Sequence, residues 1–351
     1  MESSEQFSKN VARWALTSPK EAELILKKGS LKVEFCTTGS KDLNLKREEE
    51  GETYYYHSTQ NALKEAEQWF SSLDLYNIST LFVYGVGLGY YYQAAKEWLR
   101  ANRARHLVFI EDDSDVIVQL FQMELGTELL HDPQVTLLLI GLSRDEEPQD
   151  VEKRLFSLPY TLLLGNIRLS ALNLYSQIHE PHVFLLNLQL EYLKNVKIYQ
   201  VMEYMRFGEA FFHNFYRNLL ELPKAYLGDK LYGKFEGVPA IICGAGPSLD
   251  KNLPLLKELE DRALIFAGGS AMNAINTFGI LPHFGVGVDP NLGQYVRLMM
   301  NQAYEVPFFY RNRIFPEALQ SLHGPRLFIL GAGGYPISKW IEEQFGVSES
   351  R

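Results

Sequence analysis

Cysteine is scarce in this sequence, and its scarcity limits where the protein works. The 351 residues contain two cysteines, Cys36 and Cys243, which lie far apart in strand-like runs. Two isolated thiols exclude a disulfide framework and are typical of small buried side chains in a reducing compartment. The first ten residues, MESSEQFSKN, have no apolar signal core. We therefore expect a cytoplasmic protein.

Basic residues are fewer than acidic ones. Lys and Arg total 34 against 43 for Asp and Glu, which gives a formal net charge of −9. A general nucleic-acid binder needs a basic face for phosphate contacts, so this balance argues against nucleic acid as a partner. The content of 46% hydrophobic and 13% aromatic residues excludes wholesale disorder. A chain of this length fits two or three domains.

Charge is absent from one long stretch, Ala263–Val288, which contains no Asp, Glu, Lys or Arg. A run of this length could be taken for a membrane-spanning segment. Glycine, asparagine and proline interrupt it and divide it into strand, turn, helix and strand. We therefore predict buried core of a soluble domain and no membrane span.

The order of predicted elements indicates an α/β protein with two Rossmann-like parallel sheets joined by a helical segment. Residues 1–75 are expected to form a small α+β N-terminal cap, in which LKREEEGE is a solvated turn. Residues 76–187 are expected to form the first Rossmann-like domain. A helical connector and linker covers 188–237, and a second nucleotide-binding domain covers 238–351.

A glycine-rich turn opens the first Rossmann-like domain. The strand Leu81–Tyr84 leads into Gly85, Gly87 and Gly89, and the next strand ends at Glu111. This layout is typical of a nucleotide site in which glycines approach phosphate and the acid binds ribose. It also fits an empty Rossmann-like scaffold, so these four residues form a second candidate pocket with both interpretations open. Later strands of this sheet are predicted at Val135–Ile140, Tyr160–Leu164 and His182–Leu186.

The second glycine turn, in Pro239–Asp250 (PAIICGAGPSLD), is the principal candidate site. A short β-branched strand precedes Gly244 and Gly246, and a helix begins near Pro247 and Ser248. Glycines let a ligand approach the backbone, and the free N–H groups of the helix start attract an anion. The glycines could instead serve only to pack the chain. No Gly-Lys-Ser/Thr follows, so the turn is not a Walker P-loop.

Further polar residues follow the next two strands of the second domain. Ser270 comes after the strand Ala263–Ala267, and Asp289 and Asn291 come after Phe284–Val288. The carboxyl ends of parallel strands meet at one edge of a sheet, so these side chains should gather near Ser248. Asp289 could bind a ribose, a base or a hydrated divalent ion, or it could simply start a turn before a proline.

The residues GAGPSLDKNLPLLKEL and GGSAMNAINTFGILPHFGVGVDPN resemble a domain shared by Maf-type flagellin glycosyltransferases and archaeal 6-hydroxymethylpterin pyrophosphokinases. The upstream LFVYGVGLGYYYQAAKEW and HLVFIEDD resemble the Rossmann-like domain that precedes it in Maf-type proteins. The GxGPSL turn is also similar to bacterial sialyltransferases that use CMP-activated nonulosonic acids. Ala245 stands where those sialyltransferases have Asn. The families continue with further elements of the active site, so we expect a fragment or a chain lacking part of the catalytic half.

The resemblance implies a donor-nucleotide site. Gly244, Gly246, Pro247 and Ser248 would hold the nucleotide phosphate and sugar. Ser270, Asp289 and Asn291 would line the cytidine or ribose side. The implied activity is transfer of a nonulosonic sugar from a CMP-sugar donor to a hydroxyl of a protein acceptor. The alternatives are a pyrophosphokinase that uses ATP with Mg²⁺ and a non-catalytic nucleotide-binding or scaffold protein. The sequence indicates no catalytic residue and no metal ligands for the transferase.

Overall fold

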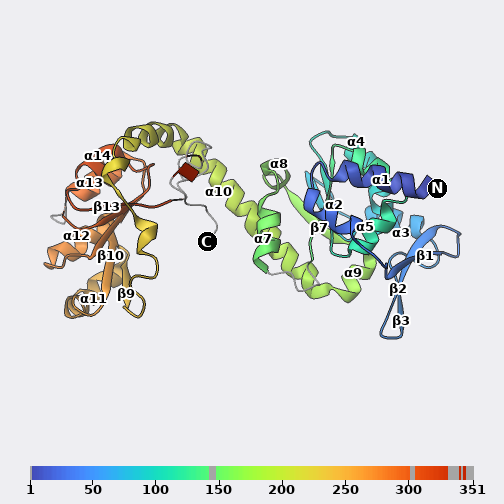
Figure 1. Ribbon diagram of the computed structural model, residues 1–351, viewed down its shortest axis with the longest axis horizontal. Helices are drawn as coiled ribbons and strands as arrows, with labels where there is room; N and C mark the ends of the chain where they lie inside the picture. Colours follow the sequence, from blue (N-terminus) through green and yellow to red (C-terminus); the bar gives the residue numbers. More distant parts are fainter. Residues whose placement is uncertain (1, 142–147, 301–304, 331–339, 341–342, 345–351) are drawn as a thin grey trace. The chain divides into compact units, whose positions relative to one another are not determined.

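The computed structural model describes the chain apart from residues 1, 142–147, 301–304, 331–339, 341–342 and 345–351 (Figure 1). Its contacts divide the chain into two compact units, Met1–Gln200 and Val201–Arg351. The division falls inside the 40-residue helix α10 (Glu180–Leu219), so this helix contributes residues to both units. The segment predicted as a connector, 188–237, therefore has its two ends in different units.

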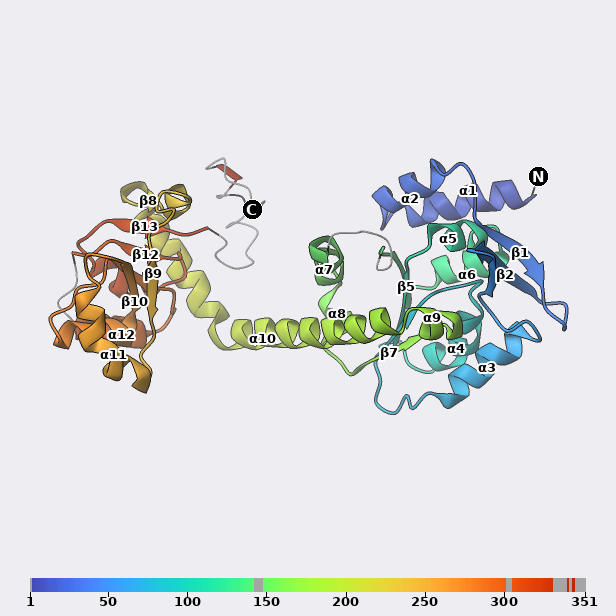
Figure 2. The same ribbon diagram turned by 90° about the horizontal axis from the view of Figure 1, so that it is seen from below.

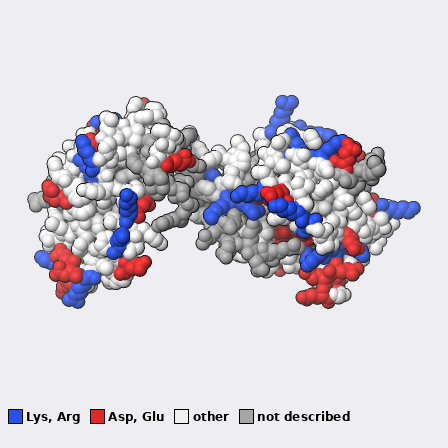
Figure 3. All heavy atoms as spheres, viewed as in Figure 1, with Lys and Arg blue, Asp and Glu red and all other residues white. Residues whose placement is uncertain are grey.

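The first unit begins with helices and a three-stranded antiparallel sheet of order β1-β2-β3. These elements are α1 (Glu2–Trp14), α2 (Pro19–Leu26), β1 (Val33–Thr37), β2 (Leu43–Glu49), β3 (Glu52–Tyr55) and α3 (Ala62–Ser72). Glu50 and Gly51 join β2 to β3 with φ of 53° and 85°, the geometry of a type I′ hairpin turn. Figure 3 shows acidic side chains gathered at the tip of this hairpin.

The charge run LKREEEGE is therefore mostly strand, and the prediction of a turn across it was wrong. Five of its residues, from Leu45 to Glu49, belong to β2, and only Glu50 and Gly51 form the turn. β2 pairs with β1 on one edge and with β3 on the other. Backbone pairing on both edges satisfies its N–H and C=O groups, and a local charge pattern does not reveal such partners.

The N-terminal helices share a core with the parallel sheet that follows. The indole Nε1 of Trp14 donates to the carbonyl oxygen of Leu137 at 3.1 Å, and Asn10 Nδ2 donates to that of Phe121 at 2.9 Å. The rings of Trp14 and Phe121 meet edge to face with centroids 5.4 Å apart. Both donors are buried and bonded. Figure 2 shows α1 and α2 beside α5 and α6, so the N-terminal helices pack on the domain of the parallel sheet.

The sheet of the first unit has four parallel strands in the order β6-β5-β4-β7. Its strands are β4 (Thr80–Tyr84), β5 (His106–Glu111), β6 (Val135–Leu139) and β7 (Ile167–Ala171). Its helices are α4 (Tyr90–Arg100), α5 (Ser114–Leu120), α6 (Glu124–His131), α7 (Pro148–Phe156), α8 (Tyr160–Leu163) and α9 (Asn173–Ile178). All five residues of β4 are buried, as a central parallel strand requires.

Two predicted strands of this sheet were wrong. Tyr160–Leu163 is the short helix α8, and the segment 182–186 lies inside α10. The fourth strand is instead β7, which pairs with β4 from Ile167 opposite Thr80 to Ala171 opposite Tyr84. Short apolar runs do not distinguish a strand from a buried helix, and that ambiguity explains both errors.

The second unit contains a six-stranded parallel sheet of order β8-β13-β12-β11-β10-β9. Its strands are β8 (Tyr226–Leu227), β9 (Ala240–Cys243), β10 (Leu264–Gly268), β11 (Phe284–Gly287), β12 (Phe308–Tyr310) and β13 (Arg326–Phe328). Its helices are α11 (Pro247–Glu258), α12 (Gly269–Thr277), α13 (Leu292–Met299) and α14 (Pro316–Gln320), with 3-10 turns at Leu222–Lys224 and Gly228–Leu231. The predicted α/β fold with two parallel sheets is thus confirmed.

The strands from β9 to β12 follow one another across this sheet in a single direction. Right-handed crossovers of this kind place the connecting helices on the same face. Figure 1 shows α11, α12, α13 and α14 along one side of the strands. Each of α11, α12 and α13 therefore begins at the same edge of the sheet. None of the described helices is both long and apolar enough to cross a membrane.

Candidate functional site

The carboxyl ends of β9, β10 and β11 form the edge at which the predicted site residues lie. Cys243 pairs with Ala267, and Gly268 pairs with Val286, so the three strands end side by side. The turn containing Ser248 follows β9, and the turn containing Asp289 follows β11. The turn of β10, with Ser270, lies between them. All three predicted turns thus occupy one edge of one sheet.

The turn after β9 is open to solvent. Gly244, Ala245, Gly246, Pro247 and Ser248 are all exposed, and α11 begins at Pro247 with Gly246 as its N-cap. Proline suits this first helical position because it has no N–H to satisfy. Within the described residues, no side chain caps the helix. The N–H of Leu249 donates to the carbonyl oxygen of Gly246 at 2.9 Å, so among the described residues the N–H of Ser248 is the one in this first turn that stays free for water or a ligand.

Nothing in the described fold requires a glycine at position 244 or 246. A Cβ at Gly244 would have no atom within 4 Å, and one at Gly246 would meet only the Oγ of Ser248 at 3.9 Å. Gly246 has φ −94° and ψ 164°, which any residue can adopt, and the φ of Gly244 is also outside the left-handed region. Glycine also lets a ligand come close to the backbone, and this function is compatible with the open space at both positions.

The helices α12 and α13 repeat the arrangement on the next two strands. Their N-caps are Gly268 and Asn291, and no described side chain caps either helix. Ser270 is exposed in the first turn of α12. The positive ends of three helix dipoles therefore point at the same edge, which is the electrostatic condition for anion binding.

An ion pair joins the turn after β11 to the helix α13 that follows it. Arg297 Nη2 donates to Asp289 Oδ2 at 2.5 Å, and the two side chains are 36% and 48% exposed. The guanidinium also lies against Gly269, where a Cβ would be 3.2 Å from Nε of Arg297. Gly269 has φ 44°, so both its backbone and its neighbour favour glycine. A half-exposed pair of this kind adds about 0–1 kcal/mol to stability. Its relevance is therefore that it places a cation and a carboxylate at this edge of the sheet.

Hydrogen bonds from other parts of the second unit hold the backbone of the turn after β11. The buried amide of Asn214, on α10, donates to the carbonyl oxygen of Pro290 at 2.8 Å. The backbone N–H of Phe315 donates to the carbonyl oxygen of Asp289 at 3.0 Å. These bonds hold the backbone of the turn while the Asp289 carboxylate stays at the surface.

Sequence reasoning missed two residues of this edge, Arg297 and Gln294. Both lie on α13 inside the run LGQYVRLM, which offered only helical periodicity. Gln294 is 3% exposed, and its Nε2 has no hydrogen-bond partner among the described residues. Polar residues in the first two turns of a helix that starts at a sheet edge are the signal that could have identified them.

The glycine turn of the first unit has a different environment. Gly85, Gly87 and Gly89 are buried and have φ of 91°, 52° and 82°. A Cβ at Gly85 would lie 2.5 Å from the ring of Tyr175, and one at Gly87 would overlap the ring of His57. Side chains of the protein thus occupy the space beside these glycines.

Glu111 is also enclosed. It is fully buried, and its carboxylate accepts hydrogen bonds from the backbone N–H groups of Val86, Asp112 and Asp113 and, at 2.5 Å, from the hydroxyl of Tyr175. Burial raises the pKa of Glu111 to about 8. The acid predicted to bind ribose is therefore bonded to its own chain. Among the described residues, no group of three or more His, Cys, Asp or Glu side chains has an arrangement suited to a metal ion.

Comparisons with known proteins agree with this architecture. A family model described as 6-hydroxymethylpterin diphosphokinase MptE-like matches residues 213–350, which include the strands β9 to β13 and the three turns. The fold of the chain is similar to the structure of MAf glycosyltransferase from Magnetospirillum magneticum AMB-1, with a TM-score of 0.54 and 14% identity. The likeness covers 93% of this chain and 56% of that one.

A curated relative adds a shorter match. An uncharacterized protein from Treponema pallidum (strain Nichols) is 36% identical over 69 residues, which are 20% of this chain and 31% of that protein. The chain thus spans about half the length of the solved structure it matches and a third of this relative. The predicted resemblance is confirmed, since residues 213–350 match the MptE-like family model and the fold of the chain is similar to that of a Maf glycosyltransferase.

Proposed function

We propose that the MptE-like unit binds a nucleotide sugar at the edge formed by the ends of β9, β10 and β11, and that the protein acts in glycosyl transfer. The observation that carries this proposal is the pair Gly244 and Gly246. Their Cβ positions are open, and they stand at the uncapped N-terminus of α11. Glycine at such a position lets a phosphate approach the backbone N–H groups.

The chemistry of the edge suits the phosphate of a leaving nucleotide. The backbone N–H and the hydroxyl of Ser248 supply hydrogen-bond donors, and Arg297 supplies a cation. Donors arranged in advance around the phosphate stabilise the negative charge that develops as the glycosidic bond breaks. Asp289 and Asn291 provide acceptors for ribose hydroxyls or the base. The donor we propose is a CMP-linked nonulosonic sugar, with a Ser or Thr hydroxyl of a protein as acceptor.

A pyrophosphokinase is the second candidate, and the description of the matching family favours it. In that reaction the same turn would hold the phosphates of ATP. Asp289 would then bind Mg²⁺ through water, and Arg297 would have to release it or share it. The two candidates differ in the base and in the need for Mg²⁺, so a binding experiment separates them.

Calorimetric titration of the whole chain with CMP, CDP, and ATP with and without Mg²⁺ tests the proposal. We expect the cytidine nucleotides to bind more tightly than ATP. Ser248→Ala should weaken binding about threefold to tenfold, because it removes one neutral hydrogen bond worth about 0.5–1.5 kcal/mol. Asp289→Ala should also weaken binding through loss of the ribose acceptor.

Arg297→Ala should weaken binding more, by about tenfold or above, because a hydrogen bond to a charged group contributes about 1.5–3 kcal/mol. The matched control is Arg262→Ala, since Arg262 is exposed and makes no side-chain hydrogen bond or ion pair with the described residues. Preference for ATP with Mg²⁺ would support the kinase instead. Binding of none of the nucleotides would contradict both and support a non-catalytic scaffold.

A further inference from the structure

The first unit contains a pocket of about 510 Å³ that is separate from the edge of the MptE-like sheet. Residues of the segment Tyr55–Asn61, of helix α3 and of helix α9 line it. The helix α9 follows β7, and β7 lies beside β4 on the side opposite β5. The chain reverses direction across the sheet between β4 and β7, which is where open α/β sheets bind ligands. The volume is in the range of small-molecule sites, about 300–1,000 Å³.

Primary amides dominate the lining of this pocket. They come from Gln60, Asn61, Gln68, Asn173 and Gln177. Lys64 and Glu65 are its charged members, and Ser58 and Tyr55 add hydroxyl groups. A single lysine opposed by a glutamate is a poor site for phosphate. An amide both donates and accepts hydrogen bonds, and so does a ligand hydroxyl group.

Three of these amides are unused by the fold. Gln60, Gln68 and Gln177 are exposed, and none of their side chains makes a hydrogen bond with a described residue. Asn173 is committed, because its Nδ2 donates to Glu65 Oε1 at 2.6 Å. The pocket thus has a fixed amide beside the carboxylate and, among the described residues, three free amides.

The floor of the pocket contains a buried donor without a partner. His57 Nε2 accepts a hydrogen bond from the backbone N–H of Leu88 at 3.0 Å, and burial lowers the pKa of His57 to about 3. The ring is therefore neutral, and its proton lies on Nδ1. That atom is buried and has no hydrogen-bond partner among the described residues. An unpaired buried donor costs free energy. The His57 side chain has no accessible surface, so a partner from outside the fold reaches Nδ1 when the side chains around it move.

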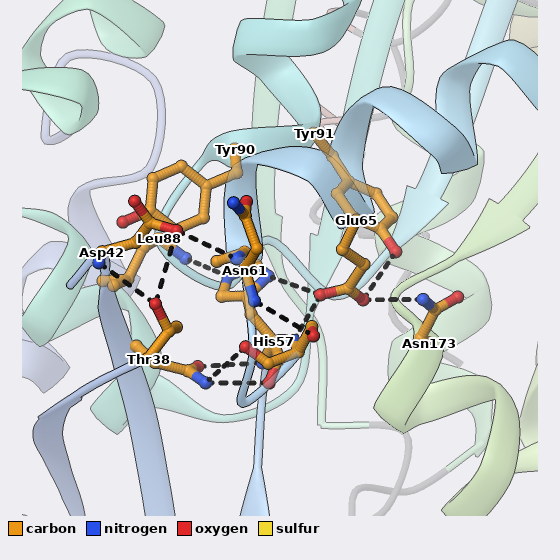
Figure 4. Close-up of polar contacts among 12 residues, drawn as sticks. Thr38, Asp42, His57, Asn61, Glu65, Leu88, Tyr90, Tyr91 and Asn173 are labelled. Carbon is orange, nitrogen blue, oxygen red and sulfur yellow. Dashed lines mark hydrogen bonds and ion pairs between the residues drawn. The ribbon is translucent and has the colours of Figure 1, made fainter. Parts of the chain in front are cut away.

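The nearest acceptor is too far away to serve. Glu65 Oε2 lies 3.9 Å from His57 Nδ1 and accepts from the backbone N–H of Ser58 at 2.5 Å. Figure 4 shows the Glu65 carboxylate between His57 on one side and Tyr91 and Asn173 on the other. An oxygen about 2.8 Å from each atom would bridge this gap. A hydroxyl group meets both needs, since it accepts from Nδ1–H and donates to the carboxylate.

We propose that this pocket binds a neutral saccharide through its hydroxyl groups. One hydroxyl bridges His57 Nδ1 and Glu65 Oε2, and neighbouring hydroxyls bond to the amides of Gln68 and Gln177. The lining has one cation and one anion, so it does not favour a strongly charged ligand. Its amides offer both hydrogen-bond donors and acceptors. This proposal does not depend on nucleotide binding by the MptE-like unit.

Saturation-transfer NMR on the whole chain tests the proposal, with glucose, galactose, mannose and N-acetylglucosamine as probes at millimolar concentration. Acetamide is the comparison ligand, since it has amide groups and no hydroxyl. We expect saturation transfer to at least one sugar and none to acetamide. Gln68→Leu and Gln177→Leu should each weaken that sugar's binding at least threefold. Gln93→Leu is the matched control, because Gln93 is also an exposed helical glutamine of the first unit and makes no side-chain hydrogen bond with a described residue.

A second readout addresses the floor of the pocket without any substitution. The Nδ1 proton of His57 should give a resolved signal that shifts when the sugar is added, because a hydroxyl oxygen becomes its acceptor. Absence of binding to all four sugars would overturn the proposal. Equal transfer to acetamide would overturn it too, as would an equal loss of binding in Gln93→Leu.

Discussion

The two glycine turns of this protein have similar sequences and opposite environments. In the first unit Gly85, Gly87 and Gly89 are buried and have positive φ, and His57 and Tyr175 fill the adjacent space. In the second unit Gly244 and Gly246 are exposed, have ordinary backbone angles and have open Cβ positions. The backbone angles and neighbouring side chains explain why the turn of the first unit has glycines. They do not explain the glycines of the second unit. A glycine that the fold does not need is the better indication of a ligand.

The comparison extends to the electrostatics of each turn. The first turn is closed by Glu111, which is bonded to its own chain, and by the neutral ring of His57. In the second unit, the turn with Gly244 and Gly246 lies at the same sheet edge as two more turns, and the three turns lead into α11, α12 and α13, which no described side chain caps. The half-exposed pair of Asp289 and Arg297 lies at this edge too. None of Gly85, Gly87 and Gly89 lines the open pocket of the first unit.

The largest effect we predict is that of Gly85→Ala. The left-handed backbone costs a non-glycine residue about 1–2 kcal/mol, and forcing a Cβ against Tyr175 and Leu172 adds about 1–3 kcal/mol. We therefore expect the first unit to lose about 2–5 kcal/mol of unfolding free energy. Urea denaturation followed by a signal of each unit measures this. A loss of less than about 1 kcal/mol would contradict the conclusion that the fold requires glycine in the buried turn.

A double-mutant cycle between His57 and Gly87 sharpens the same point. Gly87→Ala should destabilise because its Cβ overlaps the His57 ring, and His57→Ala should destabilise because it leaves a cavity and frees the buried N–H of Leu88. The double variant should be more stable than the sum predicts by about 1 kcal/mol or more, since removal of the ring makes room for the methyl group. Simple additivity in urea denaturation would show that the ring does not fill the turn.

The burial of His57 also predicts how the unfolding free energy depends on pH. Its pKa in the folded state is about 3, well below its ordinary value of 6.5. Between these values the unfolded chain binds a proton that the folded chain does not, so stability falls as pH decreases through this window. His57→Gln keeps an acceptor for Leu88 and cannot titrate. The difference in unfolding free energy between the wild type and this variant should therefore change by up to about 1.4 kcal/mol per pH unit below 6.5. A constant difference from pH 7 to pH 4 would contradict a neutral buried ring.

The sequence predicted the local part of these two sites and not their surroundings. The strand before each turn, the turn itself and the helix after it follow from local rules for β-branched runs and glycine, and β4, α4, β9 and α11 confirm them. What fills the first turn comes from residues far along the chain, His57 and Tyr175. Nothing in the pattern GVGLG indicates them. The same lack of long-range information hid the pairing of β2 and the guanidinium of Arg297 beside Gly269.

The smallest predicted change in stability is that of Gly246→Ala, and it is the most informative for function. The backbone angles suit alanine and the new methyl group meets only Ser248 Oγ at 3.9 Å, so the fold should tolerate it within about 0.5 kcal/mol, or gain slightly from a stiffer unfolded chain. Gly29→Ala is the matched control in the first unit, where a Cβ also has no atom within 4 Å. Cytidine nucleotide affinity should fall at least tenfold in Gly246→Ala and stay unchanged in Gly29→Ala, because a methyl group would block phosphate from the first N–H groups of α11. Unchanged affinity in a stable Gly246→Ala protein would mean that the open glycine turn does not receive the phosphate.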